Sequence, residues 1–290
     1  MHLCIFNPEH DLCLAKGRAN YVPPRSAVDF AKRASSLMHI LYPDAKCLSA
    51  YDETLRIVAK KAEKITAWGW NNVVKTELLK RNVPQTLLPN DTEIATIRRL
   101  QHRSTILPLQ QEAWSVTSEA EVERLLQEEK NVVLKAPWSG AGRGLRWLHT
   151  VMTPIDRDWL AKVVAQQGMV IAEKTRTVVE DLALEYMVTD HILHFRGYSL
   201  FRTGSGVYKE NIPLTDSEIE QRIAKLTQPH THRLLDKRAE VELWLQTNIV
   251  PFYHGPLGID LMVDQSHNIY VAEMNLRHTM GMVAHAENNK

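Results

Sequence analysis

The sequence predicts a mixed fold, in which an N-terminal α/β domain with a parallel sheet is followed by α+β lobes with antiparallel strands. Three observations support this prediction. Short apolar strands alternate with helices over residues 1–95. A glycine-rich loop follows an apolar strand at residues 139–144. Two strands that carry acidic and amide side chains form a hairpin over residues 258–275.

The composition is that of an ordinary globular protein, with 290 residues, 44% of them hydrophobic and 24% charged. A formal net charge of +1 provides no overall field that would attract nucleic acid or an anionic membrane, so neither partner is expected. The three cysteines are odd in number and lack the spacing of a zinc site, which favours reduced thiols. No signal peptide or membrane-spanning apolar run is evident, so we expect a cytoplasmic protein.

The first 95 residues are predicted to form a Rossmann-like domain with strands at 3–6 and 64–68. One helix is expected at 72–80, and another begins at Ser26, a plausible N-cap because Asp29 follows three residues later. The polar loop from Glu9 to Asp11 follows the first strand, where α/β sheets commonly bind ligands. Local capping by its side chains is the competing interpretation.

The rest of the chain is predicted to alternate between helices and mainly antiparallel strands. The expected helices are residues 92–102, 117–129, 216–226 and 237–247. The expected strands are residues 131–135, 145–148, 170–174, 182–188 and 192–201, followed by the two arms of the closing hairpin.

The glycine-rich loop has the residues that a phosphate site needs. Lys135 ends an apolar strand, and the loop then presents Ser139, Gly140, Gly142 and Gly144. Glycine lets the backbone approach a phosphate and point N–H groups at it, and a lysine adds positive charge. The pattern is neither a P-loop nor the dinucleotide fingerprint. A nucleotide site of another type and a flexible hairpin tip therefore remain as two interpretations.

The closing hairpin carries three oxygen ligands. Asp260 lies on the first arm, while Glu273 and Asn275 share one face of the second arm because strand side chains alternate. The neighbouring residues are apolar, and a carboxylate in a buried sheet is costly unless it is paired or bound to metal. Two carboxylates and an amide oxygen suit Mg²⁺. A hairpin with a polar, solvent-facing side is the competing interpretation.

These segments together resemble the ATP-grasp superfamily over about residues 95–285. The run Lys-Ala-Pro-Trp-Ser-Gly-Ala-Gly-Arg-Gly-Leu-Arg that starts at Lys135 is similar to the glycine loop of biotin carboxylases. The spacing of Asp260, Glu273 and Asn275 is similar to that of the Mg²⁺ ligands of D-alanine–D-alanine ligases. Residues 171–174, Ile-Ala-Glu-Lys, look like the hinge strand of the same ligases.

The resemblance implies an organisation and a set of cofactors. The expected parts are a Rossmann-like domain at 1–95, a small lobe with the glycine loop at 96–170, and a C-terminal lobe with the metal hairpin at 171–290. The implied cofactors are ATP and Mg²⁺, or Mn²⁺ in its place. Glu173 and Lys174 would meet the adenine, and Glu180 would meet the ribose.

Two departures from the family pattern bear on function. The lysine that usually precedes the small lobe is missing, and Arg103 is the candidate to replace it. Gly258 stands where D-alanine ligases have a substrate-binding arginine, which argues against that activity. Arg277, just after the hairpin, resembles an arginine of carbamoyl-phosphate synthases and several carboxylate–amine ligases.

The implied function is an ATP-dependent ligase that activates a carboxylate as an acyl phosphate and joins it to an amine or thiol. Lys135 and Arg277 would be its catalytic residues. Its substrates would be small-molecule or peptide carboxylates and amines, and a homodimer is the assembly often found among related ligases. Two alternatives stay open: an ATP-grasp-type kinase acting on a small molecule, and a non-catalytic ATP-binding protein.

Overall fold

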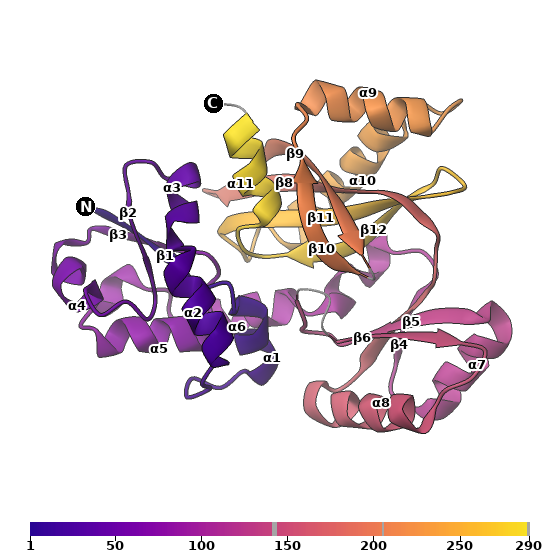
Figure 1. The fold of residues 1–290 in the computed structure, drawn as a ribbon, viewed down its shortest axis with the longest axis horizontal. Coiled ribbons are helices and arrows are strands. Elements are labelled where there is room, and N and C mark those ends of the chain that lie inside the picture. Colours follow the sequence, from indigo (N-terminus) through magenta and orange to yellow (C-terminus); the bar gives the residue numbers. More distant parts are fainter. Residues whose placement is uncertain (141–143, 205, 289–290) are drawn as a thin grey trace.

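The computed structural model describes residues 1–140, 144–204 and 206–288, and Figure 1 shows their arrangement. The described residues form three β-sheets, one parallel and two antiparallel. Each sheet belongs to its own lobe, and the chain runs through the three lobes in order (Figure 1). The predicted fold class, α/β followed by α+β, is confirmed.

The N-terminal lobe is built on the parallel strands β1 (His2–Phe6), β2 (Lys46–Ser49) and β3 (Lys64–Ala67), in the order β2-β1-β3. The first strand is central and carries Leu3 and Ile5 into the core. Around the sheet lie helices α1 (His10–Lys16), α2 (Arg25–Arg33), α3 (Met38–Leu41), α4 (Leu55–Val58) and α5 (Asn72–Lys80), with 3₁₀ helices at Ser35–Leu37, Ala59–Lys61 and Gln85–Leu87.

Two details of this lobe differ from the sequence prediction. Helix α2 begins at Arg25 after Pro24, and Ser26 lies inside it, so the predicted N-cap was wrong. The segment that we expected to be a loop contains α1, which begins directly after the polar residue Glu9 and ends at Gly17 in the left-handed conformation.

The small lobe is a four-stranded antiparallel sheet in the order β4-β7-β5-β6. Helix α6 (Asp91–Leu100) and a 3₁₀ helix (Arg103–Leu109) lead into it. Its strands are β4 (Ala113–Val116), β5 (Asn131–Lys135), β6 (Leu145–His149) and β7 (Val170–Lys174). Helices α7 (Glu119–Glu129) and α8 (Pro154–Gln167) cover one face (Figure 1), where Leu126 and Leu160 pack in one core with Leu134.

The boundary between the small lobe and the C-terminal lobe lies a few residues after residue 170, where it was expected. Strand β7 pairs with both β4 and β5, so residues 171–174 belong to the small-lobe sheet. The next strand starts at Val178 and belongs to the following sheet. The division into three domains itself stays a prediction.

The C-terminal lobe is a five-stranded antiparallel sheet in the order β10-β9-β8-β11-β12. Its strands are β8 (Val178–Thr189), β9 (Ile192–Gly204), β10 (Val207–Ile212), β11 (Gly255–Asp264) and β12 (Ile269–Asn275). Helices α9 (Asp216–Leu226) and α10 (Arg233–Asn248) pack on one face through a core that includes Ile223, Val241 and Leu245. Helix α11 (Met280–Asn288) returns across β9 to contact α3 of the first lobe.

None of the described helices combines the length and the apolarity that a membrane span requires.

Candidate functional site

The closing hairpin brings its predicted oxygen ligands together. Asp260 on β11 lies directly opposite Glu273 on β12. A bulge follows, because Leu261 pairs with Val271 and Ala272 is the extra residue. Asn275 completes the group by donating a hydrogen bond from Nδ2 to Asp260 Oδ2 over 3.3 Å.

At the hairpin, the surroundings of Asp260 disfavour the charged form of its carboxyl group. Burial raises the pKa of Asp260 well above its ordinary value, and the nearby carboxylates Glu273 and Glu185 raise it further. Two carboxylates and an amide that converge in this way fit a divalent cation, because a hard cation prefers oxygen ligands and would relieve the repulsion. Among the described residues, no three His, Cys, Asp or Glu side chains are grouped as metal ligands, so a metal at the hairpin would depend on Asn275 as well as the two carboxylates.

Arg103 joins the glycine loop to the hairpin. It lies in the 3₁₀ helix before β4 and is only 8% exposed. Its Nη1 donates to Ala136 O and to Ser139 Oγ, both over 2.5 Å. Its Nη2 donates to Glu273 Oε1 over 2.7 Å. The arginine therefore lies between the glycine loop and the hairpin.

Lys135 forms a buried ion pair with Glu173. Its Nζ lies 2.6 Å from Glu173 Oε2, and the two side chains are 13% and 4% exposed. The pair forms because Lys135 lies opposite Ile171 on β7, and Glu173 is two residues further along the same face. Gln110 donates to the other carboxylate oxygen, Glu173 Oε1, over 3.2 Å.

The described part of the glycine loop packs tightly against the first lobe. A Cβ atom on Gly140 would lie 2.4 Å from Asp11 Oδ2, so only glycine fits there without displacement. Gly144 has a φ of 76°, a left-handed conformation that favours glycine, and its carbonyl accepts a hydrogen bond from Ala136 N over 2.9 Å. Gly142 lies outside the described residues.

Lys174 and Glu180 lie in ion pairs of their own. Lys174 Nζ lies 2.7 Å from Glu112 and 2.9 Å from Glu129. Glu180 accepts from Arg222 Nε over 2.5 Å. Within the described part of the chain, no hydrogen bond links either residue to the Lys135, Arg103 and hairpin group, so the structure does not bring these two predicted residues into that cluster.

Arg277 binds an aspartate that the sequence prediction did not assign to the site. Its Nε and Nη2 donate to the Asp11 carboxylate, with a shortest distance of 2.9 Å. Nη2 also donates to Asn275 Oδ1 over 3.0 Å, and Nη1 donates to His278 O over 3.1 Å. Burial alone would raise the pKa of Asp11, but Arg277 and His10 outweigh it and hold this pKa below its ordinary value.

Glu185 is a second site residue that the sequence prediction missed. It is buried on β8, and burial raises its pKa to about 7. Ser199 and Thr279 each donate a hydrogen bond to it over 2.9 Å. A lone glutamate in the apolar run of residues 182–188 was the available signal, because it is the same pattern that pointed to the hairpin.

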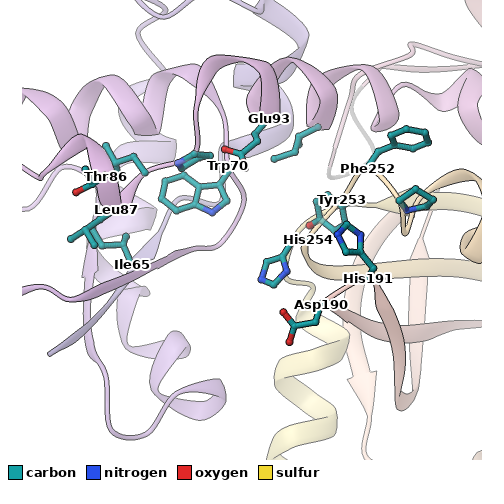
Figure 2. A pocket seen from close by; sticks show the side chains of 14 residues that line it. Ile65, Trp70, Thr86, Leu87, Glu93, Asp190, His191, Phe252, Tyr253 and His254 are labelled. Atoms are coloured by element: carbon teal, nitrogen blue, oxygen red, sulfur yellow. The ribbon is translucent and has the colours of Figure 1, made fainter.

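Cavities lie between the first lobe and the five-stranded sheet. One has a volume of about 590 Å³, and Figure 2 shows Trp70 on the first-lobe side and His191, Tyr253 and His254 on the other. Two neighbours have volumes of about 430 and 290 Å³. The smaller of these is lined in part by Arg277, which connects it to the ionic cluster just described.

Comparison with solved structures identifies the fold. The structure of N5-carboxyaminoimidazole synthetase from Staphylococcus aureus with ADP matches with a TM-score of 0.54 and 13% identity, over 96% of this chain and 70% of the other. The chain has the ATP-grasp fold.

Two further structures with the ATP-grasp fold agree with this result. N5-carboxyaminoimidazole ribonucleotide synthetase from Thermus thermophilus matches with a TM-score of 0.52 and 16% identity, over 96% of this chain and 72% of the other. The biotin carboxylase domain of Hydrogenobacter thermophilus 2-oxoglutarate carboxylase, with MgADP and bicarbonate, matches with a TM-score of 0.54 and 12% identity, over 98% and 68%. No family model and no curated protein matches the sequence.

Proposed function

We propose that this protein is an ATP- and Mg²⁺-dependent ligase that activates a carboxylate as an acyl phosphate and joins it to an amine or thiol. The main support for this proposal is the position of Arg103, which contacts both the glycine loop and the hairpin carboxylate Glu273. One cationic side chain thus connects a candidate phosphate loop to a candidate metal site. The matched synthetase and carboxylase structures with bound ADP support the same interpretation.

Each predicted residue has a role in this proposal. Lys135 and Arg103 hold phosphate oxygens together with loop amides that include those of Ser139, Gly140, Gly142 and Gly144. Glu173 and Lys174 meet the adenine, and Glu180 meets the ribose. Asp260, Glu273 and Asn275 hold Mg²⁺, or Mn²⁺ in its place. When bound, the ion supplies positive charge near the transferring phosphoryl group, where these transfers need it.

Arg277 has few N–H donors left for binding a substrate carboxylate. The hydrogen bonds given above engage its Nε, both Nη2 protons and one Nη1 proton. One N–H of Nη1 is left for a substrate, so a bidentate grip on a carboxylate would require Asp11 to move. We therefore assign Arg277 to orienting the reacting carboxylate through a single contact, with its position fixed by Asp11.

We extend the proposal to the setting of the reaction. The substrates are small-molecule or peptide carboxylates and amines. A homodimer is proposed because the matched carboxylase domain is described as a dimer. A cytoplasmic location is proposed because all three cysteines are free and buried, as expected in a reducing compartment.

Nucleotide binding tests the metal and phosphate assignments. We expect Asp260→Asn and Glu273→Gln to weaken binding of Mg-ADP, measured by calorimetry, by about a hundredfold or more, because each removes a charged ligand of the cation. The exposed Glu240→Gln serves as the matched control and should bind as the unmodified protein does. Equal Mg-dependent affinity in all four proteins would contradict the site.

Product analysis then tests the reaction class. ADP and phosphate that form only when a carboxylate and an amine are both present indicate a ligase. A phosphorylated small molecule would indicate the kinase alternative. Binding of Mg-ADP with no turnover on a broad panel of acids and amines would indicate a non-catalytic nucleotide-binding protein.

A further inference from the structure

The cavity of about 290 Å³ beside Arg277 has an unusual charge pattern. Its charged lining residues are Lys64, Arg196 and Arg277, and no carboxylate side chain is among the described residues that line it. Lys64 comes from β3 of the first lobe, whereas Arg196 comes from β9 of the five-stranded sheet. The cations therefore face one space from two different lobes.

Two of these cations have no counter-ion among the residues that the structure describes. Arg277 is neutralised by Asp11 at 2.9 Å. Arg196 and Lys64 form no ion pair and no side-chain hydrogen bond within the described ranges 1–140, 144–204 and 206–288. Both side chains are exposed, so solvent screens their mutual repulsion, but an anion that enters the cavity would meet both positive charges.

Tyr42 on the cavity wall is hydrogen-bonded to His278, which lines the neighbouring cavity of about 430 Å³. Tyr42 OH and His278 Nε2 are hydrogen-bonded over 2.9 Å, and His278 Nδ1 is 3.1 Å from Trp68 O. Burial lowers the pKa of His278 to about 4, so this ring is neutral near pH 7 and its two nitrogens are both used. The Tyr42 hydroxyl and the His278 ring are therefore engaged, and the charged groups left for a ligand are the two cations.

Arg196 is placed to reach a ligand from either side. It lines both this cavity and the neighbouring one of about 430 Å³, which also share Tyr42 and Met187. Trp70, Tyr253 and His254 connect the same space to the larger cavity of Figure 2, whose walls are aromatic and apolar in part. An elongated molecule could thus extend from Arg277 past Arg196 toward open solvent.

We propose that the carboxylate substrate carries a second anionic group, either another carboxylate or a phosphate, and that Arg196 and Lys64 bind it. The reacting carboxylate would lie at Arg277, and the second anion would neutralise the two unpaired cations. The identification of the bound molecule as a substrate rests on the proposed ligase function. The anion site itself depends only on the cavity. Arg196 and Lys64 are thereby specificity-determining residues.

Direct binding of small anions to the nucleotide-free protein tests this proposal. The probes are glutarate, 3-phosphonopropionate and butyrate, measured by calorimetry at constant ionic strength. We expect at least one of the two probes with two anionic groups to bind about tenfold more tightly than butyrate, because two exposed cations each add about threefold. The tighter of the two identifies whether the second group is a carboxylate or a phosphonate-like anion.

The variants separate this site from general charge effects. Arg196→Ala and Lys64→Ala should each weaken binding of the preferred probe by about threefold. Arg202→Ala is the matched control on the same strand, since its partner is the exposed Glu210 outside the cavity, and it should leave affinity unchanged. Equal binding of butyrate and both dianions would overturn the proposal, and so would full affinity in both cavity variants.

Failure here and failure of the ligase proposal are distinguishable. Mg-ADP binding is measured on the same Arg196→Ala and Lys64→Ala proteins. We expect it to be unchanged, because no hydrogen bond or ion pair joins either residue to the hairpin or to the described part of the glycine loop. Loss of anion binding with intact Mg-ADP binding supports the second-anion site. Intact anion selectivity with no Mg-ADP binding in any protein would remove the ligase proposal and leave an anion-binding cavity.

Discussion

The ion pair between Asp11 and Arg277 is the residue-scale contact on which the candidate site most depends. Both side chains are largely buried, with exposures of 12% and 17%. Arg277 also holds Asn275, one of the proposed metal ligands, over 3.0 Å. Removing one partner leaves the other as a buried charge without a counter-ion, which is more costly than removing both.

We therefore expect Arg277→Ala to lower the free energy of unfolding by about 3–5 kcal/mol. The double variant Asp11→Ala/Arg277→Ala should lose clearly less than the two single losses combined, because the stranded charge is gone. Urea unfolding of the four proteins measures this coupling. The exposed pair Arg202 and Glu210 provides a parallel cycle, in which coupling should stay below about 1 kcal/mol. Additive losses for Asp11 and Arg277 would contradict the buried pair.

Residue positions were predictable from the sequence where the interaction is local. Asp260 and Glu273 are joined by one short turn, so strand alternation alone predicted that they would meet. Asp11 and Arg277 are 266 residues apart, and no periodicity connects them. Arg103 was predicted only through the family resemblance, because nothing in its local sequence indicates contact with Glu273. Glu185 was not predicted because its hydrogen-bond partners, Ser199 and Thr279, lie on other elements of the chain.

At the scale of elements, helix α11 depends on a glycine at its first turn. A Cβ atom on Gly281 would lie 2.1 Å from Glu185 Oε1 and 2.2 Å from Ser199 Oγ. Both of those side chains are buried and hydrogen-bonded to each other, so they have little room to move. The close approach of α11 to β8 and β9 is what encloses Glu185.

We expect Gly281→Ala to destabilise the protein by about 1–3 kcal/mol, as overpacking of a filled site usually does. Helix propensity alone predicts the opposite sign, a gain of about 1 kcal/mol. Thermal or urea unfolding decides between the two signs. Glu287→Ala, at an exposed position of the same helix, is the control and should change stability by less than about 0.5 kcal/mol.

Elements with a strong pattern were predictable, and short ones were not. The strand at residues 131–135 and the helix at residues 72–80 match β5 and α5 because apolar runs or clear caps define them. Helix α1 has seven residues and no side-chain cap, so no start signal separates it from a polar loop. Strand β2 has only four residues and is held by its pairing with β1, which a local window does not contain.

At the scale of the whole molecule, buried titratable groups of opposite kinds make stability depend on pH. Burial raises the pKa of Glu9 and of Glu185 to about 7 from 4.5. The stability linked to each glutamate is complete below about pH 4.5 and is lost as pH rises through about 7. Burial lowers the pKa of His10 and of His278 to about 4 from 6.5. The stability linked to each histidine is present above about pH 6.5 and is lost as pH falls through about 4.

Glu185→Gln should isolate one of these opposing contributions. The stability of the variant relative to the unmodified protein should improve by about 3 kcal/mol as pH rises from 4.5 to 7, because glutamine has no proton to lose. Urea unfolding across this range measures the difference, and the exposed Glu210→Gln should give a curve parallel to the unmodified protein. Parallel curves for Glu185→Gln would show that Glu185 titrates normally.

The span of 266 residues between Asp11 and Arg277 also affects how the protein is made. At a synthesis rate of about 5–20 residues per second, Asp11 waits roughly 13 to 53 seconds for its partner to emerge. During that time the newly made first lobe has a carboxylate that cannot be buried without its counter-ion. We expect this lobe to finish packing only after the last hairpin is translated, so that the candidate active site and the mature N-terminal lobe form together.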